Sequence, residues 1–329
     1  MRQRSDELDS LSCRITAALQ VNPRASWVSI AEALGEPERT VTRRGKELLD
    51  SGDVRVVGVI GATGAVVLRA RCHVGMARAV AVGLARRDDT MFVYATSGHE
   101  ECVAEVLVDD AHLADLMLDD LPGITGIRRV RVDPITRVYR SVREWRPAIL
   151  NAHQIAALTP PVHEGYQPDG RVGPEISTLH RSILRVLAED ARTPTSDIAR
   201  VVGATENTVR RHMDTLEQTN KSRLRVVVEP ALLGYSAEAL AWVKVPPRHH
   251  EALVELLLAH SEVRYAVALA GSDSLLVNLA CPDRMALHRM TTASDWATLA
   301  DAISVVSILR ATKRSGNRLL AADSASYLY

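Results

Sequence analysis

Cysteine is scarce in this chain of 329 residues, which contains only four. Cys13, Cys72, Cys102 and Cys281 are scattered, with no C-x-x-C pair, and no set of histidines and cysteines has the spacing of a zinc site. We interpret Cys13 and Cys72 as small buried apolar residues rather than redox sensors. The sequence therefore predicts no metal and no cofactor.

An excess of charge of either sign is also missing. Forty Lys and Arg balance forty Asp and Glu, and 47% of the residues are hydrophobic. This balance argues against a histone-like protein that binds DNA by net charge alone, although it leaves room for local basic faces. The length is sufficient for two to four domains with cores of their own.

Long apolar runs are absent too. No segment approaches the length that crosses a membrane, and residues 1–7 lack the apolar run of a signal peptide. We therefore expect a cytoplasmic protein without a membrane partner.

What the chain does contain is a duplication. An offset of 168 residues aligns residues 8–49 with 176–217 without a gap, and twelve of the 42 aligned positions are identical. Most of these are apolar residues or glycine at helical spacing, which is typical of a small three-helix core. A repeat of this length predicts a duplicated domain. The identical pairs are Leu11/Leu179, Ile15/Ile183, Leu19/Leu187, Arg24/Arg192, Ile30/Ile198, Ala31/Ala199, Gly35/Gly203, Glu38/Glu206, Thr40/Thr208, Val41/Val209, Arg43/Arg211 and Leu48/Leu216.

Each copy has the pattern of a helix-turn-helix. The apolar residues at i, i+3, i+7 and i+11 from Leu8 form one face of a first helix. A second helix should end at Gly35, since glycine readily adopts a left-handed conformation. The third should begin near Pro37, and in the second copy Thr205 is a suitable N-cap. Two helices around a glycine-containing turn predict a helix-turn-helix.

The third helix carries the candidate DNA contacts. Arginine can pair with guanine, asparagine with adenine, and threonine or arginine can hold phosphates. The alternative is a solvated helix face with ordinary surface arginines, but Thr-Val-x-Arg occurs in both copies and favours double-stranded DNA as the partner. The candidates are Arg39, Thr40, Arg43, Arg44 and Lys46 in the first copy, and Asn207, Thr208, Arg210, Arg211 and His212 in the second.

These stretches carry a family resemblance. Residues 190–199 and 203–216 of the second copy, and 22–25, 30–35 and 40–44 of the first, resemble the Lrp/AsnC family of bacterial and archaeal transcription regulators. Residues 229–235 are similar to the family's link between its DNA-binding and regulatory domains. The resemblance implies a regulatory domain that pairs with another copy and binds small effectors, often amino acids.

The remaining patterns fit two regulatory domains of ferredoxin-like β-α-β-β-α-β order. The near-continuous apolar content of their strands predicts that the two units associate through their sheets, within one chain or between two. The first should contain strands at 66–72, 91–96, 102–108 and 127–133 and helices at 77–86 and 111–121. The second should contain strands at 240–245, 263–270, 275–280 and 303–309 and helices at 248–260 and 284–300.

The chain is thus expected to be α+β, with two winged-helix/helix-turn-helix domains and two ferredoxin-like regulatory domains. The expected divisions are a first DNA-binding domain at 1–60, a first regulatory domain at 61–145, a surface linker rich in Pro and Gly at 146–174, a second DNA-binding domain at 175–230, a second regulatory domain at 231–315 and a tail at 316–329.

An effector site is predicted at the central hairpins of the regulatory domains. The family typically has Gly-x-x-Asp there, and this chain departs from that pattern. A carboxylate would bind an effector's ammonium group, and backbone N–H groups at the turn would bind its acid. A plain polar hairpin turn is the alternative. The candidates are Gly98, Glu100 and Glu101 in the first copy and Gly271, Asp273 and Ser274 in the second.

Two other functions compete with a regulator. Siroheme decarboxylases have a similar architecture, but they carry His and Tyr-Asn near the central hairpin, and here the matching segments begin at Tyr94 and Tyr265 without that pattern. No catalytic residue is therefore predicted. The other alternative is an oligomerising scaffold with decayed helix-turn-helix units. Gly45 lies in the third helix of the first copy, where glycine costs about 1 kcal/mol relative to alanine, and this indicates that the first copy is the weaker reader of DNA.

Overall fold

The computed structural model describes residues 7–60, 64–160, 177–218 and 222–319. Residues 1–6, the linker predictions for 161–174 and the tail beyond 319 lie outside the described residues. Within the described ranges, no helix is long and apolar enough to cross a membrane.

Both helix-turn-helix units form as predicted. Gly35 and Gly203 end the second helix of each unit with φ of 66° and 70°. The Thr205 hydroxyl accepts a hydrogen bond from the Thr208 backbone N–H at 3.2 Å, so it caps the third helix of the second unit. The helices are α1 (Ser10–Val21), α2 (Trp27–Leu34) and α3 (Glu38–Asp50) in the first unit and α7 (Thr178–Glu189), α8 (Thr195–Val202) and α9 (Glu206–Gln218) in the second.

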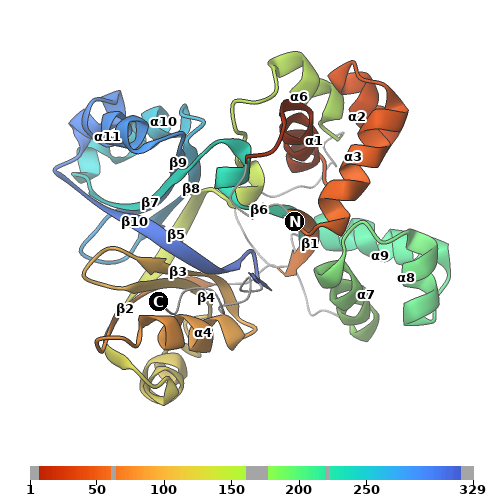
Figure 1. The fold of residues 1–329 in the computed structure, drawn as a ribbon. Helices are drawn as coiled ribbons and strands as arrows, with labels where there is room; N and C mark the ends of the chain where they lie inside the picture. Colours follow the sequence, from red (N-terminus) through yellow and green to blue (C-terminus); the bar gives the residue numbers. More distant parts are fainter. Residues whose placement is uncertain (1–6, 61–63, 161–176, 219–221, 320–329) are drawn as a thin grey trace, which may run out of the picture.

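The strand that follows each helix-turn-helix pairs with its counterpart. β1 (Val54–Ile60) and β6 (Ser222–Val228) form an antiparallel two-stranded ribbon between the two units (Figure 1). At its centre Val57 lies opposite Arg225, and these residues are related by the same offset of 168 that aligns the two copies. The ribbon therefore has a local pseudo-twofold axis, the arrangement of an isologous dimer contact inside one chain.

A reciprocal pair of arginines also joins the two units. Arg192 donates to the backbone carbonyls of Pro23 at 2.8 Å and Ala25 at 3.0 Å. Its counterpart Arg24 donates to the carbonyl of Thr193 at 3.1 Å. Arg24 and Arg192 are identical in the two copies because each holds the turn of the other unit, a role that their spacing alone did not indicate.

The regulatory strands close into one barrel. The strand order is β10-β3-β4-β2-β5-β8-β9-β7, every pairing is antiparallel, and β10 also pairs with β7. The first unit contains β2 (Ala65–Cys72), α4 (Ala77–Arg86), β3 (Thr90–Thr96), β4 (Cys102–Leu107) and β5 (Ile127–Arg140). The second contains β7 (Ala237–Lys244), α10 (His250–Leu258), β8 (Val263–Leu269), β9 (Leu275–Cys281), α11 (Arg284–Thr292) and β10 (Ala302–Arg314), which β11 (Asn317–Arg318) extends.

The two regulatory sheets face each other, and their helices lie outside (Figure 1). Alternate strand residues pack either under the helices or against the opposite sheet. In the first unit Leu68 packs beneath its helices, whereas Val67 joins Trp242 and Val267 in a core between the sheets. The strands are nearly continuous in apolar residues because both of their faces are buried.

Two strands are longer than predicted. The prediction ended the last strand of each unit at residues 133 and 309, but β5 runs to Arg140 and β10 to Arg314. β5 pairs with β2 as far as Pro134 and with β8 from Ile135 onward. β10 changes partner between Ser307 and Ile308 in the same way. Each strand therefore crosses from its own sheet to the other.

Two predicted helices are wrong in form. The segment 111–121 is a short α-turn, then a π-turn (Leu116–Asp120), then a 3₁₀ turn that contains Pro122, which cannot donate a helical hydrogen bond. The segment 284–300 is α11 followed by a 3₁₀ turn (Asp295–Leu299). The Thr292 hydroxyl donates to the His288 carbonyl, and Ser294 starts the new turn.

The beginning of the predicted surface linker is packed, not free. Trp145, the residue before this linker, is 1% exposed, and its indole N–H donates to the Ser261 carbonyl at 2.8 Å. Helix α6 (Ala152–Leu158) places Leu158 in the core of the helix-turn-helix units. Trp145, Trp242 and Trp296 are all buried, as expected of packing residues.

Candidate nucleic-acid interface

The first recognition helix, α3, has one buried and one solvent-facing side. Val41 and Leu48 are buried in the core, whereas Arg39, Arg43 and Lys46 are exposed. Thr40 and Arg44 are half-buried at the edge of the same helix. Three of the five predicted contact residues of this helix are thus exposed.

Acidic residues engage two arginines of α3. Arg43 pairs with Glu47 at 2.7 Å, and Arg44 lies 3.5 Å from Glu47 and 3.6 Å from Asp9. Such exposed pairs are weak, about 0.3–0.5 kcal/mol at i,i+4 spacing, so they do not hold the arginines firmly in place. Glu47 was not among the residues singled out from the sequence, although its i,i+4 spacing from Arg43 was visible there.

The second recognition helix, α9, differs at this point. Asn207, Arg210 and Arg211 are exposed. Thr215 stands where the first unit has Glu47, and its hydroxyl donates to the Arg211 carbonyl at 2.9 Å. The guanidinium of Arg211 therefore has no counterpart of the Arg43–Glu47 pair.

His212 and Thr208 also make contacts within the second unit. His212 is half-buried, and its ring packs edge-on against the ring of His180 in α7, with 4.4 Å between the ring centroids. The Thr208 hydroxyl lies 2.9 Å from that of the N-cap Thr205. Both residues shape the start and the inner side of α9.

The presence of Gly45 has a packing reason. A Cβ atom at this position would lie 2.3 Å from Cζ3 of Trp27, so only glycine lets the indole cross α3 here. Arg192 of the other unit lies over the same ring, with its Cζ atom 4.5 Å from the ring centroid. Packing therefore explains Gly45, which gives no support to a decayed helix.

The two predicted effector hairpins lie at the seams between the regulatory units. Gly98 lies under Val306, where an added Cβ would be 2.5 Å from Cγ1. Glu101 accepts from the Cys72 backbone N–H at 2.9 Å, and the Glu100 carbonyl accepts from the Thr96 hydroxyl. This hairpin is closely packed against the crossing strand β10.

The second hairpin is fixed by charge. Asp273 lies 3.0 Å from the buried Arg69 of the first unit, which also pairs with Asp133 at 2.5 Å. The Arg69 guanidinium lies 3.9 Å from the centroid of the Trp242 ring. At Gly271 an added Cβ would meet the Asp133 carboxylate at 2.4 Å. Ser274 accepts from the Val245 N–H at 3.2 Å and remains within its own unit.

The tyrosines at the positions compared with siroheme decarboxylases are structural. Tyr94 accepts a hydrogen bond from Arg314 at 3.1 Å, and Tyr265 donates to Glu105 at 2.9 Å; both rings are buried between the sheets. Within the part of the chain that the structure describes, no cluster of His, Cys, Asp or Glu could hold a metal ion.

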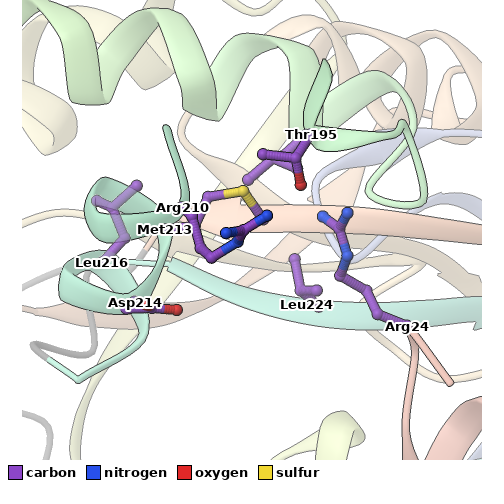
Figure 2. Close-up of a pocket in the computed structure, with 8 residues that line it drawn as sticks. Arg24, Thr195, Arg210, Met213, Asp214, Leu216 and Leu224 are labelled. Carbon is purple, nitrogen blue, oxygen red and sulfur yellow. The ribbon is translucent and has the colours of Figure 1, made fainter. Parts of the chain in front are cut away.

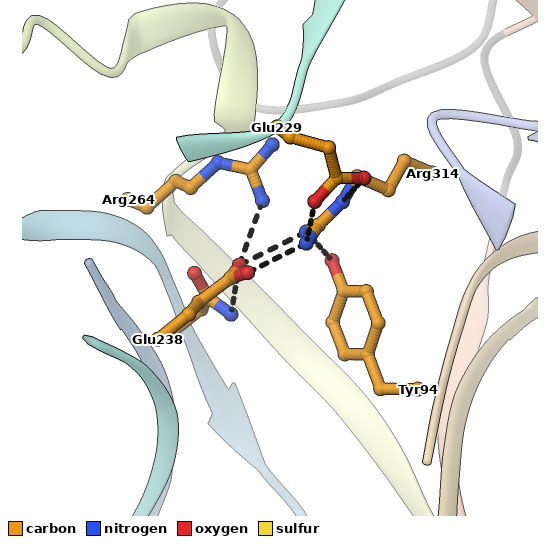
Figure 3. A network of polar contacts seen from close by, with 6 residues as sticks. Tyr94, Glu229, Glu238, Arg264 and Arg314 are labelled. Atoms are coloured by element: carbon orange, nitrogen blue, oxygen red, sulfur yellow. Dashed lines mark hydrogen bonds and ion pairs between the residues drawn. The ribbon is translucent and has the colours of Figure 1, made fainter. Parts of the chain in front are cut away.

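Arg314 belongs to a buried ionic network (Figure 3). It donates to Glu229 at 3.0 Å and to Glu238 at 2.6 and 2.9 Å, and Arg264 donates to Glu238 at 3.1 Å. Burial acts to raise the pKa of Glu238, but the two guanidinium groups outweigh it and hold that pKa below its ordinary value. Because Glu229 directly follows β6, the network ties the ribbon to the barrel.

Comparisons with known proteins agree with this architecture. The model of the AsnC-type helix-turn-helix domain matches residues 8–49, and a winged helix-turn-helix DNA-binding model matches 176–220. The siroheme decarboxylase NirDL is similar in fold over the whole arrangement, with a TM-score of 0.57, coverage of 90% of this chain and 88% of that one, and 10% identity. At that identity the likeness concerns the fold alone.

Relatives in sequence are regulators. An uncharacterised HTH-type transcriptional regulator of Pyrococcus furiosus is 30% identical over 145 residues, which are 95% of its length and 42% of this chain. Another from Pyrococcus horikoshii is 28% identical over 116 residues, 73% of its length and 35% of this chain. The chain belongs to the Lrp/AsnC family of HTH-type transcriptional regulators.

Proposed function

We propose that this chain is a sequence-specific DNA-binding transcriptional regulator that acts in the cytoplasm and contains both halves of a regulator pair. The observation that carries the proposal is the β1–β6 ribbon, in which equivalent residues Val57 and Arg225 meet at a pseudo-twofold axis. This ribbon joins two helix-turn-helix units, and each turns arginines of its third helix to solvent. Two such helices related by an axis suit successive major grooves.

The proposed operator is asymmetric. In the first unit Arg39 and Lys46 occupy the positions that Asn207 and Asp214 occupy in the second. Arginine favours guanine and asparagine favours adenine, so the two half-sites should differ. Selection of genomic fragments on the immobilised chain, followed by sequencing, tests this. Enrichment of a shared, non-palindromic site is expected, and recovery no better than with an Arg43→Ala/Arg211→Ala chain would refute DNA recognition.

Charge at one helical position should tune the affinity. Glu47→Gln removes the partner of Arg43 and Arg44 and is expected to raise DNA affinity about threefold to tenfold, because both arginines then meet phosphates without competition and a repulsive charge is lost. Thr215→Glu introduces the same carboxylate four residues after Arg211 and should lower affinity by a similar factor. Gel-shift titration measures the DNA affinity of both variants. If both variants raised the affinity, or both lowered it, the assigned helix faces would be contradicted.

The proposed role is not enzymatic. The fold is shared with NirDL, but Tyr94 and Tyr265 are buried in contacts between the sheets, so they are not available to a substrate. Addition of an iron tetrapyrrole to the purified protein separates the alternatives. We expect the absorbance spectrum of the free tetrapyrrole to persist, whereas a shifted band at one equivalent would favour the decarboxylase.

A response to an amino acid or other small metabolite is part of the proposal. Its candidate residues lie at the seams between the paired units, where a ligand could favour one pairing geometry over another. Because Arg69 holds Asp273, an ammonium group there would compete with a guanidinium, and the two hairpins should not be equivalent. Calorimetry with a panel of amino acids should show at most one tight site per chain, lost in Glu101→Gln/Asp273→Asn. Two equal sites, or binding that survives both changes, would contradict this assignment.

A further inference from the structure

A pocket of about 240 Å³ opens between the second recognition helix and the first helix-turn-helix unit (Figure 2). One part of its wall is apolar, and Thr195 of α8, Asp214 and two arginines form the rest. Arg24 reaches in from the first unit, on the side opposite Arg210 and Met213 (Figure 2). The lining residues are Arg24, Leu187, Thr195, Arg210, Met213, Asp214, Leu216 and Leu224.

In the first copy, the indole of Trp27 occupies the place that corresponds to this pocket. The offset of 168 relates Thr195 to Trp27 and Met213 to Gly45. In the first copy the Trp27 indole lies directly on Gly45, and Arg192 of the other unit covers it. Arg24 is the counterpart of Arg192, so the second copy retains the covering arginine and lacks the indole.

We propose that this pocket binds a small planar aromatic acid, with its ring in the place that the Trp27 indole occupies in the other copy. The ring would lie among Leu187, Met213 and Leu224, with the Arg24 guanidinium against it. An arginine over an aromatic face is a favourable pairing, and the Arg192–Trp27 contact shows its geometry in this same chain.

Size and charge both restrict the ligand. A cavity of about 150 Å³ with aliphatic walls is enough to hold benzene, whereas most sites for drug-sized ligands exceed about 300 Å³. The pocket therefore suits one or two fused rings with a short substituent. The charged lining residues are Arg24, Arg210 and Asp214, which together carry a net charge of +1. An acid group on that substituent is therefore favoured over an ammonium group.

The ligand would also oppose DNA binding. Arg210 belongs to the exposed face of α9 and lines the pocket. An acid bound beside it would compete with phosphates or bases for the same guanidinium, and by linkage DNA would weaken the ligand to the same degree. This coupling rests on the proposed function, whereas the binding itself does not.

Calorimetry with indole-3-acetate and the full chain, without DNA, tests the binding. One site per chain is expected, with a Kd on the order of 0.1 mM for a ligand of this size. Neutral indole should bind more weakly. No heat at millimolar concentrations, or equal affinity for the neutral ring, would overturn the proposal.

Variants locate the site. Thr195→Trp/Met213→Gly rebuilds the arrangement of the first copy and should abolish binding by filling the pocket. Arg24→Gln should weaken binding about tenfold through loss of the stacked cation. If the double variant does not fold, Arg24→Gln alone decides, and unchanged affinity in it refutes the site. A gel shift with and without indole-3-acetate then tests the coupling separately: ligand binding without an effect on DNA leaves the site standing and removes only its regulatory role.

Discussion

Replacing Arg43 and Arg211 by alanine together should weaken binding to every DNA sequence by about a hundredfold. Each arginine is exposed at the same position of its recognition helix. A charge-assisted hydrogen bond to phosphate contributes about 1.5 kcal/mol at the low end, and two of them amount to about two powers of ten. Because two phosphates are no longer neutralised, the slope of log K against log salt should also fall by about two.

The single variants should be unequal. Arg43 already pairs with Glu47 in the free protein, so its transfer to a phosphate gains less than that of Arg211. Arg211→Ala should therefore account for most of the loss. Gel shifts across a salt series measure both quantities, with Arg86→Ala/Arg248→Ala as a control that removes two exposed arginines from the regulatory units. An unchanged salt slope would show that these helices do not contact DNA.

Arg314→Met is expected to destabilise the fold by about 3 kcal/mol, the low end of the usual cost of removing one partner of a buried ion pair, because Glu238 keeps its contact with Arg264. Arg314 is 2% exposed and donates to both Glu229 and Glu238. Urea unfolding measures the loss, and Arg318→Met on the exposed neighbouring strand β11 is the matched control. A loss below about 1 kcal/mol would mean that the network contributes little.

The same network should make the barrel sensitive to acid. Since the folded pKa of Glu238 lies below its ordinary value, its ionised form contributes stability at neutral pH. That contribution is present above the unfolded pKa and is lost as pH falls through the folded pKa. The free energy of unfolding of the natural chain should therefore decrease as the pH falls below about 5. In Arg314→Met it should decrease less steeply, because the largest contribution to the lowered pKa of Glu238 is removed.

Local patterns predicted the helices of the two helix-turn-helix units well, whereas contacts between segments far apart in the sequence were not predicted. The helix α4 has the predicted bounds because it has its own periodicity and its own helix-breaking residues. The strand β5 was predicted too short because Pro134 ordinarily ends a ladder, and here it marks the point where the strand changes partners. Nothing in the residues before Pro134 specifies a second sheet beyond it.

In the candidate site, too, local features were predicted from the sequence, whereas contacts between different segments were not. The sequence identified the recognition helices and their arginines, since a helical face can be derived from spacing alone. It did not identify Glu47 as a competitor or Asp273 as the partner of Arg69, because the second contact joins residues of different units. Gly45 was misinterpreted for a related reason: the indole of Trp27 that requires it is carried by another helix.

The centre of the β1–β6 ribbon has a consequence for how such a chain can evolve. In a dimer of identical subunits, the residue on the twofold axis must face its own copy, so an arginine there would oppose a second arginine. Here Arg225 faces Val57 instead. A single chain can therefore mutate one side of the axis without changing the other, and it can place on that axis a charge that exact symmetry would forbid.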